Sequence, residues 1–158
     1  MRVGLGFDVH AFSADPARPL VLGGVRFEGS PGLTGHSDAD VVAHAVADAL
    51  LGAAGLGDLG EHFPDTDPAW AGADSLELLA RVAVLVAQAG WTVANVDCAV
   101  VLEQPELAPQ RDEMQRRLSV AAGADVRVKA RRAEGLGALG RGEGVACWAV
   151  ALVEPARG

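Results

Sequence analysis

Aromatic residues are scarce in this sequence of 158 residues, where they make up 4%, and tyrosine is absent. Since 50% of the residues are nevertheless hydrophobic, we expect a core built mainly from alanine, valine and leucine. Basic residues are also few: 13 lysines and arginines stand against 21 acidic residues, a net charge of −8. This balance argues against a nucleic-acid partner, which needs a basic surface. It still permits a phosphorylated substrate, because a few local cations and helix N-termini can bind phosphate.

Cysteine and long hydrophobic runs are rare as well. Cys98 and Cys147 are far apart, and their spacing matches no zinc knuckle or CxxC motif. They are expected to be reduced, buried thiols of a cytoplasmic protein. Charged residues such as Asp48, Glu77 and Arg81 interrupt the apolar segments, so we expect no membrane-spanning helix and no membrane partner. No apolar signal segment follows the first methionine.

The order of predicted elements favours one α/β (α+β) domain over residues 1–158. This length is sufficient for a sizeable core. Period-two and apolar segments predict strands over residues 2–12, 20–27, 92–102, 125–132 and 145–153. Helical periodicity predicts helices over residues 39–51, 75–89 and 108–121. Because strands and helices do not strictly alternate, the pattern predicts a two-layer sandwich, a mixed four-stranded main sheet with helices on one face.

Asp8, His10 and His44 form the strongest candidate site. Strand side chains alternate between faces, so Asp8 and His10 point to the same side of the first strand. A histidine from a helix packed on that side would complete an open zinc site with three N/O ligands. The alternative is an ordinary salt bridge and unremarkable histidines. On the helix, Asp40, His44 and Asp48 form a polar stripe, which predicts the two acids as outer acceptors for an imidazole or a substrate group. A solvated helix face is the alternative.

Several loops carry further candidates. His36 and Ser37 precede the first helix and suit an anion, although Ser37 could simply cap the helix. Loop residues Asp58 and Asp65 could accept hydrogen bonds from a polyol, or serve only as turn residues. Five glycines within residues 134–144 follow the basic segment 129–132. This segment could surround phosphates while its Glu134 holds a second, harder cation. A long hairpin loop with solvated charges is the alternative.

Five motifs together resemble one enzyme family. They are residues 6–12 (GFDVHAF), 36–40 (HSDAD), 58–60 (DLG), 63–68 (FPDTDP) and 140–144 (GRGEG). In their order and spacing they closely resemble the 2-C-methyl-D-erythritol 2,4-cyclodiphosphate synthases of the non-mevalonate isoprenoid pathway. The resemblance covers essentially the whole chain. It implies a phosphorus–oxygen lyase that cyclises 4-diphosphocytidyl-2-C-methyl-D-erythritol 2-phosphate to the 2,4-cyclodiphosphate and releases CMP.

The resemblance also implies an assembly and a set of site residues. It implies a homotrimer with active sites between subunits, one Zn²⁺ per subunit on Asp8, His10 and His44, and a second divalent cation, Mg²⁺ or Mn²⁺, on Glu134. The methylerythritol phosphate part of the substrate would contact His36, Ser37, Asp58, Gly60 and Asp65. The cytidine and its phosphates would contact Leu102, Pro105, Leu107, Ala108, Ala130, Arg131, Arg132 and Arg141, with Arg132 also assigned to catalysis.

The chain departs from the family at two places. Arg131, Arg132 and Ala133 stand where the family usually has a run of threonines, one of which contacts the diphosphate. Ala138 stands where an aromatic residue is common near the trimer axis. Two other functions stay open from the sequence: a zinc-dependent phosphohydrolase that uses water as the nucleophile, and a trimeric metal-stabilised binding protein without activity.

Overall fold

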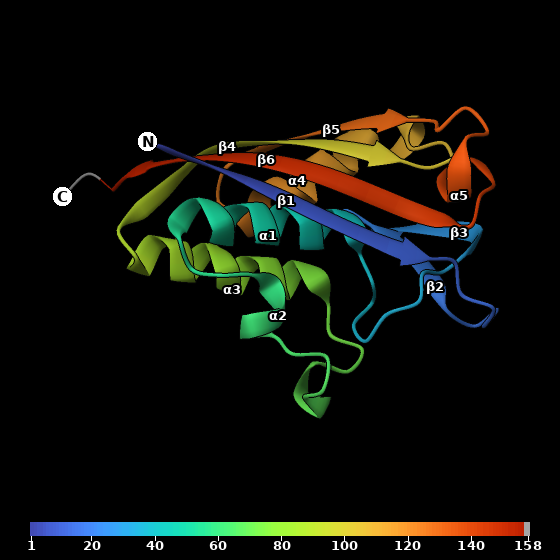
Figure 1. Cartoon of the computed structure of the whole chain (residues 1–158), viewed down its shortest axis with the longest axis horizontal. Helices are drawn as coiled ribbons and strands as arrows, with labels where there is room; N and C mark the ends of the chain where they lie inside the picture. The colour runs from blue at the N-terminus through green and yellow to red at the C-terminus, as the bar shows by residue number, and fades with distance from the viewer. Residues whose placement is uncertain (157–158) are drawn as a thin grey trace.

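The computed structural model describes residues 1–156, which form two layers (Figure 1). One layer is a four-stranded sheet in the order β1-β6-β4-β5. Its strands are β1 (Arg2–Ala11), β6 (Gly144–Pro155), β4 (Trp91–Val101) and β5 (Asp125–Arg131). Strand β6 is antiparallel to both β1 and β4, and β4 is parallel to β5. The predicted mixed four-stranded sheet is therefore confirmed.

The other layer consists of helices on one face of this sheet (Figure 1). They are α1 (Val41–Ala54), α3 (Ser75–Gln88) and α4 (Arg111–Ala122). Helix α1 packs against β1, β6 and α3, while α4 packs against β5 and α3. The shorter helical elements are α2 (Leu59–His62), η1 (Pro68–Trp70), η2 (Ala108–Gln110) and α5 (Gly137–Gly140).

A separate hairpin replaces one predicted strand. The expectation of a single strand over residues 20–27 is wrong, because the chain forms β2 (Pro19–Leu22) and β3 (Val25–Pro31), which pair antiparallel. Gly23 and Gly24 make the turn with φ of +58° and +72°, a left-handed pair that glycine adopts without steric cost. The fold therefore contains one strand more than the sequence pattern predicts.

Two glycines of β1 determine how closely α1 approaches the sheet. A Cβ on Gly4 would lie 2.0 Å from the Ala49 carbonyl oxygen, and one on Gly6 would lie 2.0 Å from that of Ala45. Any side chain at either position would therefore push α1 away from β1. The absence of side chains here lets the two backbones approach closely, which places the first turns of α1 against the end of β1.

The limits of α1 differ from the prediction at both ends. Asp40, and not Ser37, caps the helix, since its carboxylate accepts from the N–H groups of Val42 and Ala43. The helix continues past the predicted end at residue 51 because the left-handed C-cap is Gly55 (φ +75°), while Gly52 lies inside the last turn. In the same way, the helix expected from residue 108 begins as the short η2 and becomes α-helical at Arg111.

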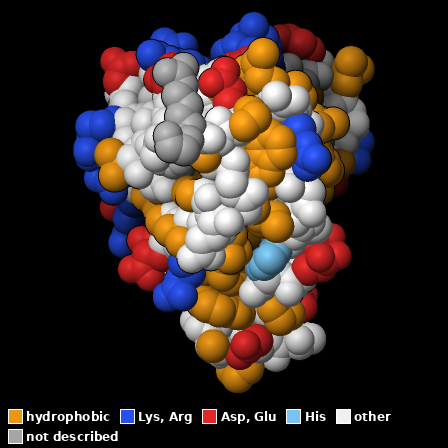
Figure 2. All heavy atoms as spheres, turned by 90° about the vertical axis from the view of Figure 1, so that its left-hand side faces the viewer, with side chains coloured by type: hydrophobic (Ala, Val, Ile, Leu, Met, Phe, Trp, Pro, Cys, Tyr) orange, Lys and Arg blue, Asp and Glu red, His pale blue; other side chains and the backbone are white. Residues whose placement is uncertain are grey.

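The sheet face opposite the helices carries large apolar side chains that are open to solvent. These are Val3, Leu5, Phe7 and Val9 of β1 and Trp148 and Val150 of β6. Figure 2 views the molecule from the left-hand side of Figure 1 and shows hydrophobic side chains reaching its surface among the charged ones. Cys98 and Cys147 lie on the other, buried side as free thiols. Within residues 1–156, no helix has the length and hydropathy needed to cross a membrane.

Candidate metal centre and active site

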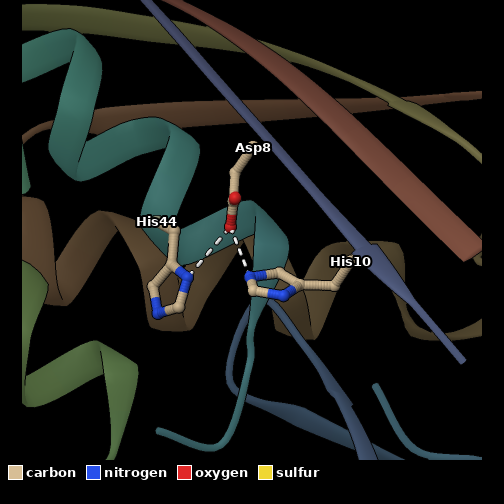
Figure 3. A group of neighbouring side chains, drawn as sticks. All are labelled: Asp8, His10 and His44. Atoms are coloured by element: carbon tan, nitrogen blue, oxygen red, sulfur yellow. Dashed lines mark hydrogen bonds and ion pairs between the residues drawn. The ribbon is translucent and has the colours of Figure 1, made fainter. Parts of the chain in front are cut away.

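Asp8, His10 and His44 converge at the end of β1 (Figure 3). The Oδ2 atom of Asp8 lies 2.9 Å from Nδ1 of His44 and 2.9 Å from Nε2 of His10. The three side chains are only 13–25% exposed. They come from the inward face of β1 and from the first turn of α1, which the small residues at Gly4 and Gly6 bring together. The predicted triad is thus present as one cluster.

In each imidazole, the nitrogen that faces away from the cluster contacts another polar group. Nδ1 of His10 lies 2.7 Å from the Thr34 carbonyl oxygen. Because a carbonyl only accepts, this nitrogen carries the proton and Nε2 keeps a lone pair. Nε2 of His44 lies 2.8 Å from the Ser75 hydroxyl, and its Nδ1 faces Asp8. The nitrogens that face the centre of the cluster are therefore the two that can act as ligands.

Arg18 holds the loop that carries these outer partners. Its guanidinium is part-buried and donates to three carbonyl oxygens, those of Leu33, Gly35 and Ser37. The loop between β3 and α1 thereby becomes a fixed support for Thr34, whose carbonyl orients His10. A charged donor to several carbonyls is worth more than a neutral one, so this loop is firmly placed.

The electrostatics of the cluster favour an anionic Asp8. Burial by itself would raise the pKa of Asp8, but the adjacent His10 and His44 rings lower that pKa well below its usual range. The Asp8 carboxylate in turn raises the pKa of His10 above its ordinary value. In the absence of other cations, the centre therefore favours a proton on His10.

The residues fit a divalent cation. Nε2 of His10 is buried, and it has no hydrogen-bond partner because its approach to Asp8 lacks hydrogen-bond geometry. The candidate ligand atoms lie within 4.8 Å of one another, and ligands around a tetrahedral Zn²⁺ stand roughly 3.3 Å apart. Two imidazole nitrogens and one carboxylate oxygen leave a fourth position open. Among residues 1–156, this is the one group of three or more such side chains that meets the spacing.

A cleft of about 590 Å³ opens beside the triad. Its lining includes the predicted polyol-binding residues Asp58, Gly60 and Asp65. The residues that the sequence patterns did not single out for this cleft are Phe7, Leu59, Phe63 and Pro64. Asp58 caps α2 by accepting from the N–H of Glu61. It therefore has the local structural role that the sequence left open, and it also lines the cleft. Asp48 lies here too, with a pKa raised chiefly by burial, and accepts from the N–H of Leu59.

A second cleft of about 350 Å³ lies at the ends of β4 and β5. It contains all of the residues that the resemblance assigns to the nucleotide between positions 102 and 132, with Glu103 and Glu106 of the same segment among them. The lining residues are Leu102, Glu103, Pro105, Glu106, Leu107, Ala108, Ala130, Arg131 and Arg132. Arg132 faces Glu106 at 3.8 Å, with 54% of its side chain exposed. Arg131 donates to the Ala130 carbonyl at 3.0 Å.

Four predicted site residues lie outside both clefts. Glu134 is exposed and has φ of +53°. Arg141 is exposed and donates to Glu143 at 2.6 Å. His36 is exposed and lies with its Nε2 3.0 Å from the Asp67 carbonyl oxygen. Ser37 is buried, with its hydroxyl 3.2 Å from Nε2 of His44. The chain itself therefore does not bring Glu134 or Arg141 to the triad.

Two sequence interpretations on the α1 side are wrong. Asp40 does not orient an imidazole: it is fully buried, and its carboxylate accepts from the N–H groups of Gly23 and Gly24 as well as from the first turn of α1. The same contacts rule out Ser37 as the helix cap. Asp38 and Ser75, which contact each other behind His44, were not predicted. Ser75 directly follows Asp74, which caps α3. In the sequence, a serine at this position indicates only the start of a helix.

Comparison with known proteins agrees with this geometry. The model of the YgbB family matches residues 1–154. A 2-C-methyl-D-erythritol 2,4-cyclodiphosphate synthase of Thermosynechococcus vestitus is 53% identical over 157 residues, which cover 98% of this chain and 96% of the relative. A bifunctional enzyme IspD/IspF of Anaeromyxobacter dehalogenans is 56% identical, and the match covers 98% of this chain but 40% of that larger protein.

A solved structure supports the same assignment. The IspF of Plasmodium falciparum, in a CDP complex, has a TM-score of 0.84 and 29% identity, covering 99% of this chain and 97% of that one. Family match, high identity along nearly equal lengths and shared fold all point the same way. This chain therefore belongs to the YgbB family of 2-C-methyl-D-erythritol 2,4-cyclodiphosphate synthases.

Proposed function

We propose that this chain, acting as one domain, is a cyclase of non-mevalonate isoprenoid biosynthesis. It converts 4-diphosphocytidyl-2-C-methyl-D-erythritol 2-phosphate into 2-C-methyl-D-erythritol 2,4-cyclodiphosphate and CMP. The observation that carries this function is the cleft in which the triad of Asp8, His10 and His44 adjoins the polyol-binding candidates Asp58 and Asp65. Membership in the YgbB family supplies the reaction to which such a cleft is suited.

The reaction closes a ring within the substrate. An oxygen of the 2-phosphate attacks the β-phosphorus and forms a new P–O bond, while the bond from that phosphorus to the oxygen of CMP breaks. CMP leaves with the bonding electron pair. Because the nucleophile belongs to the substrate, no protein nucleophile is needed. The main task of the side chains is orientation, which can lower a barrier by about 7–11 kcal/mol.

The metal positions follow from the donor sets. Asp8, His10 and His44 would hold one Zn²⁺ per subunit, and Glu134 would hold Mg²⁺ or Mn²⁺. When bound, these cations supply positive charge that offsets the charge developing on the phosphoryl oxygens. A non-glycine residue with positive φ, such as Glu134 at +53°, is costly to maintain and is found preferentially at functional sites, which supports a role for this carboxylate.

Substrate binding divides between the two clefts. Asp58, Gly60 and Asp65 in the first cleft, together with His36 and Ser37, would bind the methylerythritol phosphate. In the second cleft, apolar residues would contact the cytosine, and Arg131 and Arg132, with Arg141 nearby along the chain, would face the phosphates. The apolar contacts come from Leu102, Pro105, Leu107, Ala108 and Ala130.

The positions of the clefts favour an assembly of several copies. The first lies at β1 and the second at β5, which are opposite edges of the sheet with β6 and β4 between them. Three strand spacings amount to about 14 Å. A neighbouring copy could bring its second cleft to the first cleft of this chain. The exposed apolar face of β1 and β6 offers a surface for such contact, and cyclic symmetry in a homotrimer would form identical sites.

Product analysis tests the proposal. The protein is incubated with the cytidyl diphosphate substrate, with and without a chelator, and the products are identified by mass. Cyclic diphosphate and CMP, lost on chelation, are expected. An open-chain or inorganic phosphate product would identify a hydrolase instead. Substrate retained without turnover would identify a binding protein. Light scattering of the same sample measures the assembly, and an active monomer would contradict the shared site.

A further inference from the structure

A chain of hydrogen bonds runs from the back of His44 to a carboxylate on the loop before α1. The hydroxyl of Ser75 lies 2.8 Å from Nε2 of His44 and donates to Oδ1 of Asp38. The N–H of Ser75 also donates to Oδ2 of Asp38, at 3.1 Å. Ser75 is 1% exposed and is the first residue of α3. Three separate segments of the chain therefore meet behind one candidate ligand.

The direction of the protons along this chain follows from the chemistry of its ends. The Ser75 hydroxyl donates its hydrogen bond to Oδ1 of Asp38, because carboxylate oxygens act as acceptors. The Ser75 oxygen is then left to accept, and its donor is the Nε2–H of His44. A neutral imidazole with its proton on Nε2 has a lone pair on Nδ1. That nitrogen lies 2.9 Å from Asp8, so its lone pair is available to a cation that binds between the two groups; without the cation, Nδ1–H donates to the Asp8 carboxylate across the same distance.

We propose that Ser75 and Asp38 are positioning residues that fix the tautomer and the ring orientation of His44 for metal binding. This inference rests on the metal centre of the proposed function. Outer partners of this kind raise the affinity of a ligand without touching the ion. Ser37 is a weaker partner than Ser75, because its oxygen lies 3.2 Å from Nε2, compared with 2.8 Å for that of Ser75.

The hydrogen-bonded series of His44, Ser75 and Asp38 is called the relay below. Zinc affinity of the full-length protein, measured by competition with a chromophoric chelator, tests it. Ser75→Ala removes the acceptor of the Nε2 proton and should weaken zinc binding by about 10–100-fold. Asp38→Asn should weaken it as well, because the amide can donate to Ser75 and turn the hydroxyl toward Nε2. That reversal favours the tautomer with its proton on the ligand nitrogen. The double variant should bind zinc no more weakly than Ser75→Ala, since residues acting as a unit are not additive.

Two further measurements separate positioning from a general loss of structure. Ser119→Ala is the matched control, because its hydroxyl accepts a single hydrogen bond from the N–H of Val126, outside the site; it should leave zinc affinity unchanged. In the zinc-loaded unmodified protein, NMR should show a protected Nε2 proton on His44, and Ser75→Ala should lose that protection. Thermal unfolding of the metal-free variants reports whether each is folded.

The outcomes distinguish the inference from the function on which it rests. Zinc affinity within twofold of the unmodified protein in both Ser75→Ala and Asp38→Asn would overturn the relay alone. An equal loss of affinity in Ser119→Ala would also overturn it, because the effect would then be one of stability. If the unmodified protein bound no zinc, the metal centre itself would be wrong, and the relay with it.

Discussion

The proposed site has two halves: a metal half, which is the triad with the first cleft, and a phosphate half, which is the second cleft with its arginines. They differ in how firmly the surrounding protein holds their side chains. The side chains of His10 and His44 are 21% and 13% exposed, and their outer nitrogens contact a carbonyl and a buried hydroxyl. Arg132 and its partner Glu106, in the other half, are 54% and 71% exposed and 3.8 Å apart. An exposed pair of this kind contributes little to stability. The candidate metal half is thus prearranged within one chain, whereas we expect the phosphate half to take its working arrangement from a neighbouring copy or from the substrate.

Removing a metal ligand should break the prearranged half and have the largest effect. His44→Ala should lose zinc, and turnover should fall by more than the roughly 10–100-fold that loss of an outer partner costs. The variant should stay folded, because Asp40 still caps α1 and the apolar face of the helix is unchanged. Metal analysis and product assays check this.

His62→Ala provides the matched control for that variant. His62 lies in α2 with its Nε2 2.8 Å from the Leu56 carbonyl oxygen, outside the triad. It should keep its zinc. One zinc per chain and near-normal turnover in His44→Ala would show that the triad is not the metal centre.

Mixed assemblies test whether the two halves come from different copies. His44→Ala and Glu134→Ala should each be inactive alone. Coexpressed in equal amounts, they should recover about a quarter of the normal activity, because random pairing in a cyclic assembly gives that share of sites with both halves intact. The assay uses the purified mixed species.

Activity in the mixture that does not exceed the sum of the separate variants would place both halves in a single copy. A mixture of His44→Ala with Asp8→Asn serves as the control. Both of these changes damage the metal half, so no pairing of copies restores a complete site, and no recovery is expected.

The difference between local geometry and long-range contacts explains which features the sequence could predict. Asp8 and His10 follow from strand alternation, and His44 from helical spacing, because local geometry decides which way those side chains point. A Gly-Gly pair between two apolar segments is itself a local hairpin signal, so the turn at Gly23 and Gly24 was predictable; the contact of both N–H groups with the distant Asp40 carboxylate was not.

Long-range contacts also account for the other differences. Ser75 reaches His44 only because α3 packs beside α1, and no local pattern reports that. The proposed roles of Glu134 and Arg141 would depend on an interface between copies, which neither the sequence pattern nor one folded chain determines. Their assignment came from resemblance to a family, and it stays a prediction.

Replacing the arginines of the exposed half should have a moderate effect. We expect at least one of Arg131 and Arg132 to replace the missing threonine contact by a charge-assisted hydrogen bond to the diphosphate, since guanidinium groups bind phosphate in bidentate fashion. Arg→Thr at that position should lower turnover or substrate affinity by roughly tenfold, because a charged hydrogen bond is worth about 1.5–3 kcal/mol.

Steady-state kinetics of both single variants check this expectation. Arg26→Thr on β3, whose side chain pairs with Glu28 and is 63% exposed, is a control outside both clefts. Unchanged kinetics at both positions would mean that Arg131 and Arg132 are solvated charges, with the phosphates bound by cations and backbone.

The smallest expected effect is a difference in how the metal-free and zinc-loaded proteins respond to pH. Asp8 raises the pKa of His10 in the folded state. The stability that this pair provides is therefore fully present below the unfolded pKa of about 6.5, and it is lost as pH rises through the higher folded pKa. Zinc competes with that same proton, so zinc affinity, and the stability it adds, should increase over the same range.

Thermal unfolding between about pH 6.5 and 8, with chelator or with zinc, should therefore show slopes of opposite sign for this contribution. Other groups cancel in the comparison. Burial and the charge of Asp38 raise the pKa of Asp40 to about 6, but that carboxylate is present in both forms, so its contribution is the same with and without zinc. The depressed pKa of Asp8 likewise keeps it ionised throughout.

Asp8→Asn removes the cause of the rise in the pKa of His10, so the metal-free form of this variant should lose the slope. Identical pH dependence with and without zinc would show that His10 exchanges no proton for a cation, and the prearranged half would then lack the property that sets it apart from the exposed one.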